Sequence, residues 1–183
     1  MSGPRVFVDA CVLYPPLMRT LVIGAAEAGL FEPFWSARVL DEWRIAIAAK
    51  QGPEAAARAD AAAEGLAARF PESRVETAPE REAALARLMR DPADAHVLAA
   101  AAGAGADILL TFNLRDFPAR LLAGEGLAAR HPDGFLWELW SDHPETLAAL
   151  VRAALPGEDP SGLRRALKRA RLPRLGKALE AAA

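Results

Sequence analysis

The chain alternates short apolar runs with longer stretches in which apolar residues recur at helical spacing. The short runs, rich in β-branched and aromatic residues, predict strands, and the longer stretches predict helices. Strands that alternate with helices favour a parallel sheet covered by helices on both faces. We therefore predict an α/β fold with a central, mainly parallel sheet. The predicted strands are residues 5–8, 31–35, 75–77, 108–110 and 127–130.

Capping and breaking residues mark the predicted helix boundaries. Ser36 is a typical N-cap, and Gly52-Pro53 separates two helices. Pro173 separates two short basic helices that follow a linker-like cluster at 157–160. We predict an α/β domain over residues 1–142 and a basic helical extension over residues 143–183. The other predicted helices are residues 17–29, 36–50, 54–70, 79–89, 94–103, 132–140 and 144–155.

Four acidic residues stand where an α/β fold places its functional sites. Asp9 directly follows the first predicted strand, and Asp116 follows the strand near residue 110. Asp94 opens a predicted helix, and Glu42 lies on the second turn of another. In open parallel sheets, ligands bind just beyond the carboxyl ends of the strands. The pattern therefore indicates a group of carboxylates at that edge of the sheet.

Such carboxylates would repel one another if no cation lay between them. Three or four oxygen ligands are what Mg²⁺ or Mn²⁺ prefers, and such an ion can activate water against a phosphodiester. Ordinary roles remain open at two positions, because Asp94 can be an N-cap and Glu42 a solvated helix residue. Asp9 is harder to explain structurally, since an acid that ends a buried strand rarely helps folding.

Four segments, in order along the chain, resemble the motifs of the PIN domain family: FVDACVLYP, SARVLDE, DPADAHVLAAA and LLTFNLRDFP. The similarity covers about residues 5–140 and is greatest to the bacterial branch that includes VapC-type toxins of toxin–antitoxin pairs. The resemblance implies a three-layer α/β/α sandwich over residues 1–142, with the C-terminal helical extension outside it. It also implies that clustered acids bind Mg²⁺ or Mn²⁺ and that the protein uses this metal site to hydrolyse RNA.

Carried over position by position, the resemblance implies roles for several residues. Thr111 and Asn113 fall in the family's polar loop, where they would orient ligands or substrate. Cys11 stands where Asn, Ser or Thr is frequent, and Ala93 stands where an acid often precedes the third carboxylate. Both departures bear on metal affinity more than on the fold. The implied metal-binding and catalytic acids are Asp9, Glu42, Asp94 and Asp116.

Other side chains near these motifs have two interpretations each. His96 follows the third acid by two residues and would contact substrate or lie on the helix surface. Arg115 precedes the fourth acid and would contact a phosphate or remain a solvated loop residue. Trp137 and Trp140 lie one helical turn apart, where they would stack on bases or, more often, belong to the core.

Composition indicates a globular protein with an uneven charge distribution. The 183 residues are 52% hydrophobic and 25% charged, with a mean hydropathy of +0.08. Residues 160–183 carry seven basic and one acidic side chain, a net charge of +6, which leaves fifteen basic and twenty-three acidic residues elsewhere, a net charge of −8. The basic extension would meet RNA phosphates, an acidic antitoxin or a second subunit, or remain a solvated end.

Cellular location is predicted from what the chain lacks. The single cysteine, Cys11, excludes an internal disulfide and suits a reducing cytosol. We expect neither a signal peptide nor a membrane span, because polar residues interrupt every apolar run.

We interpret the sequence as a cytoplasmic, Mg²⁺- or Mn²⁺-dependent endoribonuclease, the toxin of a type II toxin–antitoxin module. Its expected partners are an RNA substrate, a cognate antitoxin and a second copy of the chain. One alternative is a PIN-like module that holds RNA or a partner without cutting. Another is a phosphatase of the haloacid dehalogenase type, but that chemistry needs an Asp at the position of Cys11.

Overall fold

The strands of the protein form one five-stranded, all-parallel sheet in the order β3-β2-β1-β4-β5. The computed structural model describes residues 3–182. β1 lies at the centre, where Phe7 pairs with Phe34 of β2 on one side and Leu109 of β4 on the other. The predicted α/β fold with a parallel sheet is confirmed. The strands are β1 (Arg5–Val8), β2 (Glu32–Ser36), β3 (Arg74–Val75), β4 (Ile108–Leu110) and β5 (Ala128–Arg130).

The helices largely follow the predicted segments. Ser36 caps α3 as expected, because its hydroxyl accepts a hydrogen bond from the Val39 N–H at 3.2 Å. Two short helices, α1 and α7, were not predicted, since four to six residues are too few to show helical periodicity. The helices are α1 (Ala10–Leu13), α2 (Pro16–Glu27), α3 (Ala37–Gln51), α4 (Pro53–Arg69), α5 (Pro79–Ala86), α6 (Ala95–Gly103), α7 (Ala119–Gly124), α8 (Pro132–Asp142), α9 (Pro144–Ala154), α10 (Pro160–Arg169) and α11 (Pro173–Ala181), with 3₁₀ turns η1 (Pro92–Asp94) and η2 (Leu114–Asp116).

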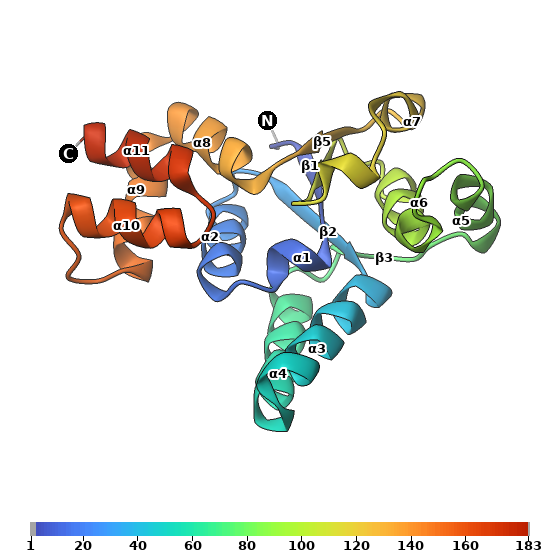
Figure 1. Ribbon diagram of the computed structural model, residues 1–183, viewed down its shortest axis with the longest axis horizontal. Helices are drawn as coiled ribbons and strands as arrows, with labels where there is room; N and C mark the ends of the chain where they lie inside the picture. The colour runs from blue at the N-terminus through green and yellow to red at the C-terminus, as the bar shows by residue number, and fades with distance from the viewer. Residues whose placement is uncertain (1–2, 183) are drawn as a thin grey trace.

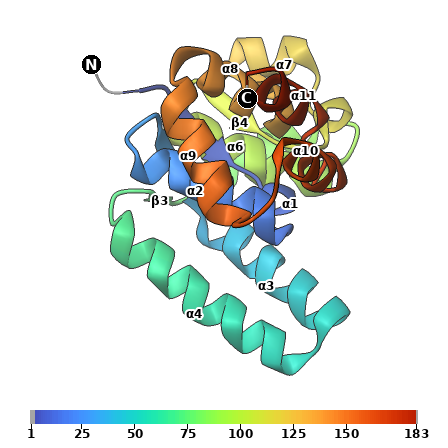
Figure 2. The ribbon, with the colours of Figure 1, turned by 90° about the vertical axis from the view of Figure 1, so that its left-hand side faces the viewer.

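Helices cover both faces of the sheet, as the three-layer prediction requires. α2, together with the C-terminal helices, lies on one side, and α6 with α5 lies on the other (Figure 1). α3 and α4 form an antiparallel pair that projects from the body of the molecule (Figures 1 and 2). Because the central strands are covered on both faces, β1 and β4 are continuous apolar runs, and residues 6–8, 109 and 110 are fully buried.

The C-terminal helices pack against the body of the protein. A Cβ atom at Gly24 of α2 would lie 2.9 Å from a methyl carbon of Leu150, so α9 approaches α2 closely and a larger residue at position 24 would displace the Leu150 side chain. At the other end of the extension, the buried Asp133 carboxylate of α8 accepts hydrogen bonds from the N–H groups of Arg174, at 2.9 and 3.1 Å, and Leu175, at 3.0 Å. Asp133 thus caps α11 from a neighbouring helix.

The predicted boundary after residue 142 coincides with the break between α8 and α9. Trp137 and Trp140 of α8 are both only half-buried, so the expectation that they form core is correct only for Trp140, which packs against the core. Across residues 3–182, no helix combines the length and the apolar character that a membrane span requires.

We predict that Asp133→Ala loosens the C-terminal helices. The change leaves two backbone N–H groups at the start of α11 without their acceptor and removes a favourable charge at a helix N-terminus, which should lower the free energy of unfolding by about 2 kcal/mol or more. Urea denaturation measures the loss, and limited proteolysis should then cut within residues 155–175. Asp142→Ala, on an exposed residue of the same helix, is the control. Equal stability of the two variants would contradict the capping role.

Candidate functional site

Asp9 directly follows the central strand β1, beside the end of β4. Its backbone N–H donates to the Leu110 carbonyl at 3.1 Å, which extends the pairing of β1 with β4 by one residue. The side chain is buried, with 7% exposure. Its Oδ2 accepts hydrogen bonds from the Thr111 hydroxyl at 2.7 Å and from the Cys11 thiol at 3.1 Å. The orientation of this carboxylate is therefore fixed by two donors.

Cys11 performs the hydrogen bonding that a polar residue would perform at its position. Burial, followed by the negative charge of Asp9, raises the pKa of the Cys11 thiol to about 12, so the thiol keeps its proton at neutral pH. Its Sγ also accepts the N–H of Phe112 at 3.3 Å. In the same loop, the N–H of Asn113 donates to the Thr111 hydroxyl at 3.0 Å. Cys11 and Thr111 together tie the loop after β4 to Asp9.

Asp94 lies at the end of η1. It is half-buried, and the negative charges of three other acids act on it. Burial, followed by the charges of Asp9, Asp91 and Asp116, raises the pKa of Asp94 to about 6. Its side chain caps no backbone N–H of α6. The cap of this turn is Asp91, which accepts the Ala93 N–H at 2.9 Å. The N-cap interpretation of Asp94 is thus not supported.

Asp91 contributes to this acidic group, although we assigned it no site role from the sequence. Its charge is one of those that raise the pKa of Asp94. The only available signal was its spacing of three residues from Asp94, which brings two side chains to one side of a helical turn.

Glu42 of α3 is held by a buried histidine rather than by water. His96 Nε2 donates to Glu42 Oε1 at 2.9 Å, and Arg38 Nε lies 3.4 Å from the same oxygen. Burial raises the pKa of Glu42, but the hydrogen bond and charge of His96, with the charge of Arg38, outweigh it, and the net shift is downward.

The expectation that His96 lies on the helix surface is wrong. The residue is 1% exposed, because α6 is covered around most of its circumference and His96 lies on the side that meets Glu42. Its Nδ1 has no hydrogen-bond partner among residues 3–182. His96 is therefore too deeply buried to form a direct surface contact, and it meets the site through Glu42.

The loop after β4 presents the remaining predicted residues. Asp116 is half-buried in η2, and its N–H donates to the Asn113 carbonyl at 3.0 Å. Asn113 and Arg115 are exposed. Arg115 forms no ion pair with an acid in the described part of the chain, so its guanidinium is available to an outside anion.

The acids lie along one edge of the sheet, but they do not form a complete metal-binding site. No three Asp, Glu, His or Cys side chains between residues 3 and 182 are grouped so that they could hold one metal ion. Asp9 is engaged by Thr111, and Glu42 by His96. The donor set still fits Mg²⁺ or Mn²⁺ chemically, since it consists of carboxylates whose mutual repulsion a cation would relieve. Binding would require some of these side chains to exchange partners.

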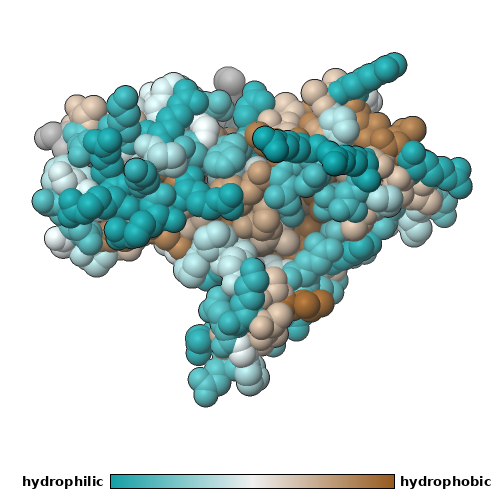
Figure 3. Space-filling view, viewed as in Figure 1, coloured by the Kyte–Doolittle hydropathy of each residue, from teal (hydrophilic) through white to brown (hydrophobic). Residues whose placement is uncertain are grey.

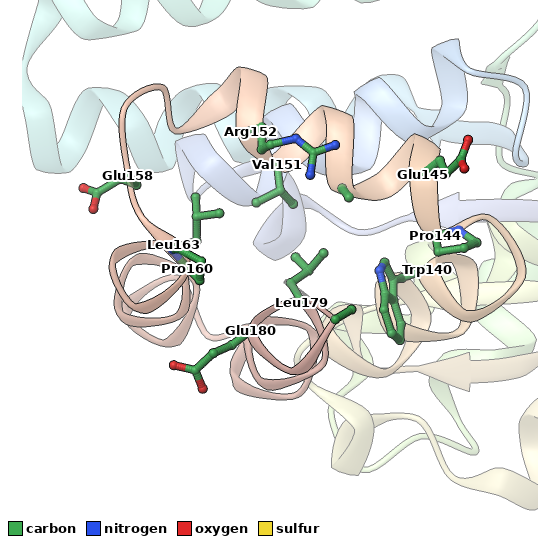
Figure 4. Close-up of a pocket in the computed structure, with 12 residues that line it drawn as sticks. Trp140, Pro144, Glu145, Val151, Arg152, Glu158, Pro160, Leu163, Leu179 and Glu180 are labelled. Carbon is green, nitrogen blue, oxygen red and sulfur yellow. The ribbon is translucent and has the colours of Figure 1, made fainter.

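An apolar pocket lies apart from these acids, among the C-terminal helices. It has a volume of about 360 Å³, and Val151, Leu163 and Leu179 face one another across it, beside Trp140 (Figure 4). None of the predicted site residues lines it. Because the ionisable and hydrogen-bonding groups converge at the sheet edge instead, we place the candidate site there.

Comparison with known proteins agrees with this geometry. A family model described as PIN domain matches residues 5–115, which is more than half of the chain and includes Asp9, Glu42, Asp94 and Thr111. No curated protein and no solved structure matches the chain. The five-stranded parallel sheet and the acids at its carboxyl edge are consistent with the match. The chain therefore belongs to the PIN domain family, and its fold is of the nuclease type.

Proposed function

We propose that this protein is a metal-dependent endoribonuclease that hydrolyses RNA phosphodiesters. The observation that carries the proposal is the environment of Asp94, whose pKa is raised to about 6 by burial and by Asp9, Asp91 and Asp116. Carboxylates whose charges act on one another in a PIN fold would be stabilised by a divalent cation, once their side chains rearrange to share it. Asp9, Glu42, Asp94 and Asp116 are the proposed ligands and catalytic residues.

The side chains of the site have separate tasks in this proposal. A bound Mg²⁺ or Mn²⁺ would polarise the phosphodiester and lower the pKa of an attacking water. Asp9, fixed by Thr111 and Cys11, would set the position of the reacting groups, which is where most of the rate advantage of such sites arises. Asn113 and Arg115, exposed on the adjoining loop, would contact the substrate.

Water, rather than a side chain, is the proposed nucleophile. The one cysteine in the site has a pKa of about 12, so its thiolate is scarce at neutral pH. His96 is directed at Glu42 and is not paired with a serine or cysteine. Cleavage is therefore proposed to occur in one step, without a covalent enzyme intermediate.

We further propose that the protein is a cytoplasmic toxin controlled by an antitoxin. The support is the resemblance of its four motifs to VapC-type toxins. A protein partner, or a second copy of the chain, would also cover the exposed apolar side chains of Ile45 on α3 and Leu88 after α5, at 67% and 66% exposure.

A second candidate is a PIN-like module that binds RNA or a partner without cutting. It is favoured by the absence, within residues 3–182, of three side chains grouped to hold one ion, and by Ala93 in place of an acid. Metal titration and cleavage assays separate the two candidates, because only the nuclease requires the cation.

We predict that Mn²⁺ stabilises the protein in a pH-dependent way. The raised pKa of Asp94 means that the metal-free folded state binds this proton more tightly than the unfolded state does. Its stabilising contribution is therefore present below about pH 4 and is lost as the pH rises through about 6. Since Mn²⁺ must displace the same proton, it should raise the melting temperature little at pH 5 and by about 5 °C or more at pH 7.5, at roughly 100-fold excess over its Kd.

Thermal melts in EDTA and in Mn²⁺ across pH 4.5–8 measure this effect. Asp94→Asn should raise the metal-free melting temperature at pH 7.5 and reduce the gain from Mn²⁺, whereas Asp142→Asn, outside the site, should change neither. Identical melting of the wild type in EDTA and in millimolar Mn²⁺ at pH 7.5 would argue against a metal site.

We predict that Asp9→Asn abolishes RNA cleavage while the fold is retained. Loss of one fixed carboxylate should lower the rate by at least about 10²-fold, the scale expected when reacting groups lose their alignment. Gel assays with structured RNA and Mn²⁺ measure the rate, with EDTA as a second control. In a bacterial host, the wild type should arrest growth and Asp9→Asn should not. Equal cleavage by the two proteins would reveal a contaminating nuclease and refute the mechanism.

We predict that His96 acts through Glu42 on metal affinity. His96→Ala removes the donor that orients Glu42 and should weaken Mn²⁺ binding about 10-fold or more, as loss of an outer hydrogen bond does at metal sites. His96→Gln, whose amide nitrogen can replace Nε2, should recover most of the affinity. Calorimetric titration gives the Kd, and circular dichroism checks that both variants fold. Unchanged Mn²⁺ affinity in a folded His96→Ala protein would exclude this role.

A further inference from the structure

The cationic side chains of α10, α11 and the turn between them have almost no acidic partners. All seven are exposed, and only Arg164 forms an ion pair, with Glu180. Figure 3 shows hydrophilic side chains gathered over the part of the molecule that these helices form, at its left. Cations left unpaired on one surface favour an anionic partner. The six with no acid within 4.0 Å, among residues 3–182, are Arg165, Lys168, Arg169, Arg171, Arg174 and Lys177.

Two of these cations are held in place by aromatic rings. The Arg171 guanidinium lies 4.4 Å from the centroid of the Phe112 ring, and that of Arg174 lies 3.5 Å from the Trp137 ring. The Asp133 carboxylate accepts the backbone N–H of Arg174, which fixes the start of α11 above α8. Stacking orients a guanidinium but leaves its N–H edge available for a phosphate. Within the described chain, neither guanidinium donates a hydrogen bond to the protein.

Phe112 brings Arg171 next to the acidic edge of the sheet. The residue lies between Thr111 and Asn113, and its N–H donates to Cys11 Sγ, which in turn contacts Asp9. The Phe112 ring also meets the His131 ring edge-on, with centroids 5.1 Å apart. The route from the Asp9 carboxylate to the Arg171 guanidinium therefore passes through only two residues.

The backbone of Arg171 has a left-handed conformation that the turn requires but that arginine rarely adopts. Its φ is 65°, and it is the one non-glycine residue among 3–182 with a positive φ. It ends α10 in the turn where glycine is favoured, with Arg171 N–H bonded to the Lys168 carbonyl and Leu172 N–H to that of Leu167. An arginine kept where glycine fits better points to a use of its side chain.

From these observations we propose that the arginine pair, Arg171 and Arg174, forms a phosphate-binding surface that holds single-stranded RNA beside the acidic edge. The remaining cations of α10 and α11 extend this surface away from the site. The inference rests on the proposed function, because it takes RNA as the substrate of the acids. It adds that the substrate is bound by α8, α10 and α11. These helices lie outside the matched PIN segment.

The test measures RNA binding without cleavage. A fluorescein-labelled single-stranded RNA of mixed sequence is titrated with full-length protein in EDTA, by anisotropy, at several salt concentrations. Arg171→Gly and Arg174→Gln should each weaken binding roughly tenfold, as loss of one charge-assisted hydrogen bond does. Each should also reduce the slope of log Kd against log salt by about 0.7, the value for one phosphate of a single strand.

Matched controls separate binding from folding and from net charge. Arg58→Gln, on the projecting helix α4, makes the same change of net charge far from the site and should bind RNA like the wild type. Arg171→Gly should melt at or near the wild-type temperature, since glycine relieves the positive φ. In Mn²⁺, both arginine variants should raise KM for RNA cleavage while kcat changes little.

The outcomes distinguish this inference from the proposed function. If RNA binding falls in the arginine variants but the wild type cuts no RNA with Mn²⁺, the surface stands and the nuclease proposal fails. If the wild type cuts RNA and the arginine variants keep wild-type affinity and KM, the surface is refuted and the nuclease proposal stands. The latter result would assign these cations to an acidic protein partner.

Discussion

Parallel pairing of β1 with β4 is the constraint on which the candidate site depends. The register sets Val8 opposite Leu110, so the next residues of the two strands, Asp9 and Thr111, meet although 102 positions separate them. The contacts of Cys11 and of the loop after β4 follow from this meeting. Cys11 reaches both strands' ends, and the loop that carries Phe112 and Asn113 is tied to it. A shift of one residue in this register would turn Asp9 to the opposite face of the sheet, and the site would not form.

Much of this arrangement was accessible from the amino-acid pattern. The apolar runs at β1 and β4, covered on both faces, have the composition of buried parallel strands, and the acids that follow them lie where such sheets place ligands. Ser36 correctly predicted the start of α3, because serine is a common N-cap residue. These features are local, because each depends on residues adjacent in the chain.

Features that depend on distant partners were harder to predict. His96 is buried because α6 packs between α5 and the sheet, and nothing in the sequence around His96 pairs it with Glu42. The stacking of Arg171 on Phe112 joins the C-terminal helices to the site loop across 59 residues, which places the extension beside the chemistry rather than at a remote end. The half-buried Trp137, expected in the core, instead supports Arg174. In each case the contact is tertiary, so the periodicity and the residue spacing of the sequence do not predict it.

The protonated thiol beside Asp9 also bears on how the protein would respond to oxidants. Peroxides attack the thiolate form of cysteine, and with a pKa of about 12 the thiol outnumbers the thiolate by about 10⁵ to one at pH 7. Cys11 is thus chemically quiet, even though it is the chain's single cysteine and lies at its most polar edge. A serine there would supply a stronger hydrogen bond, but a thiol that keeps its proton reacts slowly with peroxides, so the cysteine adds little redox sensitivity to this acidic edge.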